Sequence, residues 1–511
     1  MNFLFKIFIA FFLAFGLFSP GIFAQVTLDS TFGNNGIVII PAVNGSEINA
    51  IALQLDGKIV AAGYWASLGI YHFQIARYNI DGTLDNTFGN GGFVNTTIHN
   101  SDMPKAIGIQ PNGKIIVAGY YYTGTPTSPG AGMYHKAIVR YNPDGTLDQS
   151  FGTGGILTPE VIGPTTHEAI SSLLIQPDNK IVVGGSAGNQ FSLIRFNNDG
   201  TPDNSFGTGG FVLTSIEAAA TIYTMVLQPD NKIVVAGSTL DSIINVKFAL
   251  ARYNSDGSLD LNFGANGIIT TDFGNTNYEV CHSLALQPDN KIIAAGYFGN
   301  ILAVVRYNTN GSLDNNFGNA GIVTDSNLPG AVGVGLQSDG KIVVAGQVVV
   351  PTYDYGYSIT RFNTDGIPDS SFGTGSNIIV DIRQGNDYAQ CLIIQPDNKI
   401  IVAGSSRDGP SIPADFTLIR LTSDVVTGTT EIIPHIDDVK LYPNPVRNNI
   451  VIKIDNEIKI ENIVLYDIKG KIIAEYSPEE RNLNLSQISQ GLYLLSITTE
   501  RGIFNQPIVK L

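Results

Sequence analysis

One ten-residue segment returns seven times along this chain with only small changes. The copies read QLDGKIVAAG (54–63), QPNGKIIVAG (110–119), QPDNKIVVGG (176–185), QPDNKIVVAG (228–237), QPDNKIIAAG (287–296), QSDGKIVVAG (337–346) and QPDNKIIVAG (395–404). Each copy is followed by a segment similar to ARYNxDG. In the first six units, this second segment is followed by a third one similar to LDxxFG. The FG phenylalanines stand at positions 32, 88, 151, 206, 263, 317 and 372. One structural unit therefore spans about 57 residues.

Two tight turns recur within each unit. The fourth position of the segment is always a residue type that accepts a left-handed backbone: Gly57, Gly113, Asn179, Asn231, Asn290, Gly340 and Asn398. Proline two positions earlier, where present, presets the φ of a type I turn. The second turn carries Gly82, Gly145, Gly200, Gly257, Gly311 and Gly366. The flanking segments are rich in Val and Ile and predict strands.

Four short strands per unit, repeated seven times, predict an all-β, seven-bladed β-propeller over residues 25–424. A linear β-solenoid is the competing architecture, but its repeats are usually shorter. The ends of the array favour a closed ring. The last unit stops at residues 414–424 without an LDxxFG segment, whereas the chain begins with a spare one at residues 28–40. We expect this N-terminal strand to complete the seventh blade and to remove the exposed sheet edges.

Each unit also carries one Arg in its third strand and one Asp in LDxxFG. The arginines are Arg77, Arg140, Arg195, Arg252, Arg306, Arg361 and Arg420, and the aspartates are Asp29, Asp85, Asp148, Asp203, Asp260, Asp314 and Asp369. Charges that recur inside a repeat usually satisfy packing and polar groups. We predict one structural ion pair per blade, with Arg420 meeting Asp29 across the ring closure; seven identical anion sites are the alternative.

The returning consensus LDxxFGxxGxV, QPDGKIVVAG and ARYNxDG resembles the delta-60 repeat, a β-propeller-type repeat of secreted bacterial proteins. The resemblance covers residues 28–421. It implies the fold and says little about activity.

Residues 1–24 have the pattern of a signal peptide. Lys6 precedes an apolar stretch at residues 7–18, and cleavage is expected after Ala24. A signal anchor is the alternative. No later segment is long and apolar enough to span a membrane. The formal net charge of −15 makes nucleic acid and anionic membrane surfaces poor partners.

After a polar linker at residues 425–438, a module of short strands fills residues 439–511. Its pattern predicts a small immunoglobulin-like β-sandwich. The module resembles the type A C-terminal sorting domain of the Bacteroidetes type IX secretion system through Tyr442, Pro443, Asn444, Pro445, Gly470, Gly491 and Tyr493. The resemblance implies a secretion-machinery partner, export through the periplasm and across the outer membrane, and a secreted or cell-surface protein. An ordinary adhesion module is the alternative.

Alternate connections of a propeller emerge on opposite faces of the ring, so both constant turns share one face. The variable connections share the other face, where binding residues are expected. They carry the aromatic residues Tyr64, Trp65, Tyr71, Tyr120, Tyr121, Tyr122, Tyr134, Tyr297, Tyr353, Tyr355 and Tyr357. Such rings suit a glycan or a protein partner. Alternatively, they only pack the loops against each other.

Catalytic motifs, cofactor motifs and metal-ligand spacings are absent from the sequence. Five histidines fall in the variable connections, which their exclusion from the constant turns would also produce: His72, His99, His135, His167 and His282. A non-enzymatic binding propeller without cofactor or metal is therefore expected. A polysaccharide-acting enzyme would need acids converging on the central channel, drawn from Glu47, Glu168, Glu217, Glu279, Asp325 and Asp387. A structural adhesin or surface-layer component is the third possibility.

Overall fold

The structure is a computed structural model, and it forms two compact units, Gln25–Val425 and a second unit from Val426 onward. It describes residues 26–41, 45–67, 69–124, 132–161, 167–241, 245–274, 278–299, 301–326, 328, 330–351, 354–409, 412–423, 439–442, 446–454, 458–467, 472–499 and 502–510. The expected signal peptide (1–24) and the expected linker (425–438) both lie outside the described residues.

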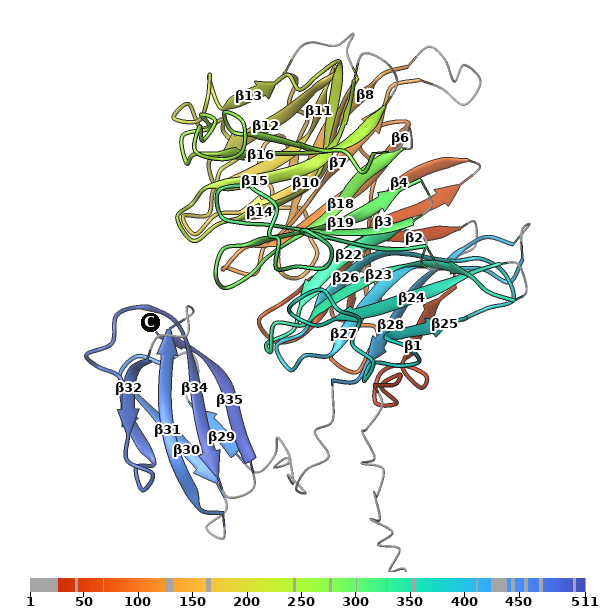
Figure 1. The fold of residues 1–511 in the computed structure, drawn as a ribbon. Helices are drawn as coiled ribbons and strands as arrows, with labels where there is room; N and C mark the ends of the chain where they lie inside the picture. The colour runs from red at the N-terminus through yellow and green to blue at the C-terminus, as the bar shows by residue number, and fades with distance from the viewer. Residues whose placement is uncertain are drawn as a thin grey trace, which may run out of the picture. The chain divides into compact units, whose positions relative to one another are not determined.

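The larger unit consists of seven four-stranded antiparallel sheets, which confirms the predicted propeller (Figure 1). Blade 1 holds β2 (Ser46–Leu53), β3 (Ile59–Ser67), β4 (Ile70–Tyr78) and β5 (Phe93–Thr96). Blade 2 holds β6 (Ser101–Ile109), β7 (Ile115–Tyr122), β8 (Tyr134–Tyr141) and β9 (Ile156–Leu157). Blade 3 holds β10 (Glu168–Ile175), β11 (Ile181–Ala187), β12 (Gln190–Phe196) and β13 (Phe211–Thr214).

The remaining blades follow the same order. Blade 4 holds β14 (Ala219–Leu227), β15 (Ile233–Leu240), β16 (Val246–Tyr253) and β17 (Ile268–Thr271). Blade 5 holds β18 (Glu279–Leu286), β19 (Ile292–Phe298), β20 (Ile301–Tyr307) and β21 (Ile322–Asp325). Blade 6 holds β22 (Ala331–Leu336), β23 (Ile342–Val349), β24 (Tyr355–Phe362) and β25 (Asn377–Val380). Blade 7 holds β26 (Asp387–Ile394), β27 (Ile400–Ser406), β28 (Asp415–Leu421) and β1 (Ile37–Ile40).

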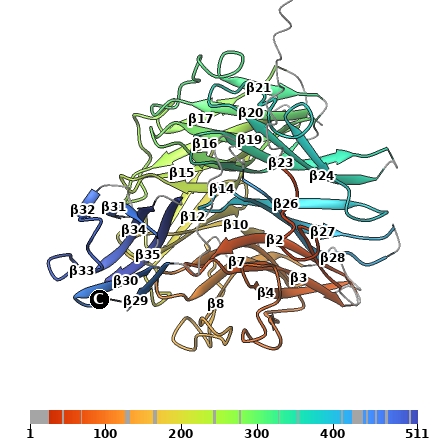
Figure 2. The same ribbon diagram turned by 90° about the horizontal axis from the view of Figure 1, so that it is seen from below.

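The ring closes as the sequence predicts. Strand β1 pairs antiparallel with β28, with Ile37 opposite Ile419 and Ile40 opposite Phe416. Figure 1 shows the red β1 beside the blue β28, although they come from opposite ends of the propeller sequence. The first strand of each blade is innermost, and each packs against the first strand of the next blade all the way round. Strands β2, β10, β14 and β26 surround the middle of the ring in Figure 2.

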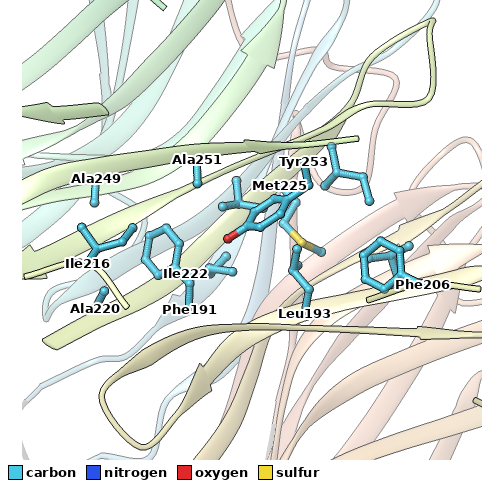
Figure 3. Packing of buried hydrophobic residues seen from close by; sticks show 13 residues of the cluster. Phe191, Leu193, Phe206, Ile216, Ala220, Ile222, Met225, Ala249, Ala251 and Tyr253 are labelled. Carbon is cyan, nitrogen blue, oxygen red and sulfur yellow. The ribbon is translucent and has the colours of Figure 1, made fainter. Parts of the chain in front are cut away.

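Apolar side chains from neighbouring blades form the core. Figure 3 shows one such layer, where Phe191 and Leu193 of blade 3 pack with Ile222 and Met225 of blade 4. Phe191 and Ile222 have no exposed surface. Full burial of such a side chain contributes about 1.5–3 kcal/mol. Each blade therefore depends on its neighbours, which is why closure of the ring matters.

Both predicted turns have left-handed residues at the expected places. The φ angle is 82° at Gly57, 65° at Asn179 and 83° at Gly82. Their equivalents in the other blades also have positive φ: Gly113, Asn231, Asn290, Gly340, Asn398, Gly145, Gly200, Gly257, Gly311 and Gly366. The turn chemistry was therefore correctly predicted.

All seven predicted Arg–Asp pairs form, at 2.6 to 2.8 Å between Nε and the carboxylate. The sequence interpretation missed a third member, the Lys of the repeated segment. In blade 1, Lys58 Nζ lies 2.9 Å from Asp85, and Arg77 Nη1 donates to the carbonyl of Pro143 in blade 2 at 2.5 Å. The guanidinium also lies over Phe88. The equivalent arginine donates to a backbone carbonyl of the next blade in six of the seven blades, so these clusters join neighbouring blades.

A second link between blades uses tyrosine hydroxyls. Tyr141 is hydrogen-bonded to Thr96 of the preceding blade at 2.8 Å. The same bond joins Tyr253 to Thr214 at 2.8 Å and Tyr307 to Thr271 at 2.6 Å. At the ring closure, Tyr78 holds the equivalent place, but Ile40 stands where the threonine would be. The buried Tyr78 hydroxyl has no hydrogen-bond partner among the described residues.

The smaller unit is a sandwich of two sheets, as predicted. One sheet has the order β29 (Val439–Tyr442), β30 (Asn449–Ile454), β33 (Asn482–Asn484). The other has the order β32 (Ile472–Tyr476), β31 (Ile460–Asp467), β34 (Gly491–Thr499), β35 (Gly502–Lys510). Ile450 and Ile452 of the first sheet share a buried core with Ile463 and Leu495 of the second.

Candidate functional site

The constant turns interlock at one end of the blades. Gly33 N donates to Asp81 O of the adjacent blade at 2.7 Å, and Gly89 N donates to Asp144 O at 2.8 Å. This end is therefore committed to holding the ring together. The variable connections lie at the opposite end of the strands, where the sequence stops repeating.

A pocket of about 280 Å³ opens at the variable end between blades 1 and 2. Four of the predicted aromatic residues line it, namely Tyr71, Tyr120, Tyr122 and Tyr134. Tyr134 packs edge-on against Tyr120 at 5.2 Å between ring centroids, and it is 43% exposed. Tyr71 is 36% exposed. We call this the aromatic pocket.

Polar groups complete the aromatic pocket. Asn100, Ser101 and Asp102 belong to its wall, together with Met103. The buried Asp102 carboxylate accepts hydrogen bonds from the backbone N–H groups of Ile98 and His99 and lies 3.1 Å from His72 Nδ1. These contacts hold the loop in one conformation. The pocket thus combines aromatic rings with a few fixed polar groups, as small-molecule sites usually do.

Five of the seven other predicted aromatic residues lie elsewhere in the variable connections and their flanking strands. Tyr64 packs edge-on against Tyr71 at 4.8 Å. Trp65 stands beside His72 and lines a separate groove of about 830 Å³ with Gln74 and Phe416. Three more make contacts with other rings. Tyr121 stacks between His99 and His135, Tyr297 packs with His282, and Tyr355 packs with Tyr388. Tyr64 therefore adjoins the aromatic pocket through Tyr71, whereas among the described residues the ring contacts of Trp65, Tyr121, Tyr297 and Tyr355 include no residue that lines it.

The prediction that Tyr357 is a binding residue at the surface is wrong. Tyr357 has no exposed surface and belongs to the core between blades 6 and 7 with Ile359 and Ala389. It occupies the place of Phe416 in blade 7 and Phe73 in blade 1, which face the next blade. Aligning the repeats would have revealed this position. Tyr353 lies outside the described residues.

Three of the six candidate catalytic acids anchor loops instead of meeting at the channel. Glu168, Glu279 and Asp387 are buried, and each accepts a backbone N–H from the connection that precedes its strand. Burial raises the pKa of Glu279 and of Asp387 to about 7. Glu217 pairs with Lys247 at 3.2 Å, and Asp325 ends strand β21. Among the residues described, no three His, Cys, Asp or Glu side chains group as metal ligands.

The innermost strand of every blade carries a β-bulge at the same place, a feature that sequence reasoning missed. The bulged residues are Asn49, Lys105, Ser171, Tyr223, His282, Val332 and Gln390. Bulges re-aim a side chain, and they are common beside functional sites. We call these seven residues the channel ring. In sequence, each stands five positions before the Gln of the repeated segment, and its type differs in every repeat.

The last glycine of the repeated segment makes room for the bulge. A Cβ added to Gly63 would lie 2.0 Å from the carbonyl oxygen of Glu47, on the bulged strand. The corresponding distance is 2.0 Å at Gly119 and 1.9 Å at Gly404. None of these glycines needs a positive φ, so close approach alone requires them. A constant residue therefore positions a variable one.

The channel ring holds titratable groups in a shared environment. Gln390 Nε2 donates to Glu47 Oε1 at 2.6 Å, and burial raises the pKa of Glu47. Burial lowers the pKa of Lys105, against the opposing effect of Glu47. Burial and then the charge of Lys105 lower the pKa of His282 to about 4. Lys105 and His282 belong to blades 2 and 5, so their interaction reaches across the ring.

Comparison with known protein families decides the family. The model described as "Domain of unknown function (DUF5122) beta-propeller" matches residues 54–88, 110–151, 176–206, 228–263, 287–317, 337–372 and 395–424. The model described as "Secretion system C-terminal sorting domain" matches residues 440–510. The chain is a DUF5122 β-propeller protein with a C-terminal sorting domain. The sorting domain indicates export through the type IX secretion system to the cell surface or the extracellular space.

Solved structures are similar to this DUF5122 protein only in broad outline. A protein of unknown function from Dyadobacter fermentans has a TM-score of 0.44 at 11% identity, covering 78% of this chain and 99% of that chain. The polysaccharide lyase Uly1 has a TM-score of 0.43 at 9% identity, covering 77% and 91%. Sqt1 from Chaetomium thermophilum has a TM-score of 0.40 at 11% identity, covering 92% and 97%. No curated protein matches the chain.

Three of the predicted motif residues lie in the described part of the sorting domain. Tyr442 ends β29 and is 49% exposed, and Gly491 begins β34. Tyr493 packs partly into the core, and its hydroxyl donates to Ser489 O at 3.0 Å. Pro443, Asn444, Pro445 and Gly470 lie outside the described residues. The described residues of the chain include no helix that could cross a membrane.

Proposed function

We propose that this exported propeller is a non-enzymatic protein that binds an extracellular glycan through its aromatic pocket. The observation that carries the proposal is the convergence of Tyr71, Tyr120, Tyr122 and Tyr134 on one concave surface with Asn100 and Asp102. Tyrosine presents an apolar ring face and a polar hydroxyl. A sugar has the same combination of apolar C–H faces and hydroxyl groups.

The exposure of these rings supports binding over loop packing alone. Tyr71 and Tyr134 keep more than a third of their surface exposed, although each is held by another tyrosine. Rings fixed in this way lose little conformational entropy when a ligand covers them. The loop under them is anchored by buried Asp102. The pocket is thus suited to a ligand that stacks on preformed rings.

The test is a glycan array probed with the mature protein and with the double variant Tyr71→Ala/Tyr134→Ala. We expect the wild-type protein to bind a defined set of glycans and the double variant to lose this binding. The matched control is Tyr355→Ala, because Tyr355 is 37% exposed at the same end of the strands but lies in blade 6. Equal binding by the double variant, or binding to extracellular proteins and no glycan, would overturn the proposal.

A further inference from the structure

The channel ring contains one positive charge, Lys105, that makes no direct ion pair within the described part of the chain and interacts with Glu47 only from beyond ion-pair distance. Lys105 is only partly exposed, and among the described residues it has no hydrogen bond and no ion pair. A lysine withdrawn from bulk water loses hydration that a counter-charge normally replaces. The repeat does not require this lysine, because the equivalent residues are Asn49, Ser171 and four other types.

Glu47 does not supply the missing counter-charge at close range. Its Oε1 accepts from Gln390 at 2.6 Å, and its Oε2 accepts from Tyr64 at 3.3 Å and from Ser405 at 3.5 Å. Both carboxylate oxygens are therefore occupied by neutral donors from blades 1 and 7. The hydrogen-bonding oxygens of Glu47 are thus taken up by neutral donors, whereas the Lys105 ammonium makes no hydrogen bond to the described residues and is affected by Glu47 only at longer range.

Apart from Lys105, the side chains of the channel ring are neutral, and most of them are polar or aromatic. Asn49 donates to the carbonyl of Pro104, next to Lys105 in the chain, at 2.8 Å. His282 lies between the rings of Tyr223 and Tyr297, at 5.2 and 5.3 Å between centroids. Its pKa of about 4 leaves the imidazole neutral at neutral pH, with one donor and one acceptor. Ser171 adds a hydroxyl group to the channel ring. This lining suits a ligand that carries hydroxyl groups as well as a negative charge.

We propose that the channel ring is a second binding site, which takes a hydroxylated carboxylate such as a uronic acid with its carboxylate on Lys105. The bulge recurs at the same place in all seven innermost strands and carries a different residue type in each, and the ammonium of Lys105, which makes no direct ion pair with the described residues, sets the sign of the ligand charge. The site uses none of the rings of the aromatic pocket, so it is independent of the proposed glycan site. The acid can arrive free or as the end residue of an acidic polysaccharide.

Calorimetric titration of the mature protein with glucuronate, and separately with glucose, tests the charge requirement. We expect glucuronate to bind about tenfold or more tightly than glucose, because a charge-assisted hydrogen bond distinguishes them. Equal binding of the two sugars, or no glucuronate binding, would overturn the proposal. A third titration uses an oligosaccharide that ends in glucuronate. Tighter binding than the monosaccharide identifies a polysaccharide end as the source, whereas weaker binding identifies the free acid; either result retains the site.

Two variants locate the site. Lys105→Met is expected to weaken glucuronate binding about tenfold or more, whereas Lys247→Met changes the net charge equally outside the channel and leaves it unchanged. Ser171→Asp is expected to have the same effect as Lys105→Met by placing a carboxylate in the ring, which covers the case in which Lys105→Met does not fold. The variant Tyr71→Ala/Tyr134→Ala should retain glucuronate binding, so the two proposals fail separately. Unchanged affinity in folded Lys105→Met, or in folded Ser171→Asp, would contradict the channel site.

Discussion

Arg420 donates from Nε to Asp29 Oδ2 at 2.8 Å, although the two residues are 391 positions apart in the chain. Both side chains are almost fully buried, and Lys399 lies 3.3 Å from the same carboxylate. The pair lies beside the pairing of β1 with β28, where the two ends of the propeller meet. Burial alone would raise the pKa of Asp29, but hydrogen bonds from Thr31 and the two cations lower it to about 2.

Loss of this pair should weaken the whole ring. Asp29→Ala leaves the Arg420 guanidinium buried without its counter-charge, and breaking a buried pair in this way costs about 3–5 kcal/mol. Urea unfolding of the mature protein measures the loss. Asp56→Ala is the control, because the Asp56 side chain is 59% exposed and should change stability by less than about 1 kcal/mol. Similar losses in the two variants would contradict a closing role for Asp29.

Gly63→Ala tests the origin of the bulge. The new Cβ would meet the Glu47 carbonyl at 2.0 Å, and backbone on both sides prevents relief. We expect a loss of at least about 3 kcal/mol, or failure to fold, as for severe overpacking. Gly91→Ala is the control, because nothing lies within 4 Å of its added Cβ and only its φ of 60° is unfavourable. The Gly91→Ala change should cost about 1 kcal/mol of stability. A Gly63→Ala protein as stable as the Gly91→Ala protein would show that the bulge tolerates a side chain.

Ile40→Thr should repair the unpartnered hydroxyl of Tyr78. Threonine at the equivalent position in blade 1, Thr96, bonds Tyr141 at 2.8 Å. Ile40→Val is the matched reference, because valine and threonine have nearly the same shape. We expect the threonine variant to be about 1 kcal/mol more stable than the valine variant in thermal or urea unfolding. Adding Tyr78→Phe to both should abolish the difference, and a difference that persists would place its origin elsewhere.

Glu279 should make stability fall as pH rises towards neutrality. Burial raises its pKa in the folded protein from 4.5 to about 7, so the folded state holds its proton more tightly than the unfolded state. The stabilisation is fully present below about pH 4.5 and is lost as pH rises through about 7. Glu279→Gln keeps a neutral side chain, so its stability should change less between pH 5 and pH 8 in urea titrations. An unaltered pH profile in this variant would assign the dependence to other groups, Asp387 being the first.

The variable end shows the limit of what could be predicted for the candidate site. The loop position of Tyr71 and Tyr134 was visible in the sequence, but their convergence with Tyr120 and Tyr122 depends on how two blades lie side by side. Tyr357 was misplaced because a loop-like sequence, QVVVPTYDYGYS, already belongs to β23 and β24 along part of its length. The channel ring was missed because a bulge breaks the alternation of a strand, and no periodicity marks it.

The amino-acid sequence by itself determined the strands, the left-handed turns, the seven blades, the closure by β1 and the export module. These features depend on residue types at fixed spacing, such as Gly82 in its turn or Asp29 in the spare LDxxFG segment, and local backbone preferences act over short distances. Only the tertiary structure decided that the charge of Lys105 acts on His282 from another blade and that Tyr71 shares a pocket with Tyr134. Such contacts join residues from separate blades, and their geometry is set by how the bulged strands pack around one axis.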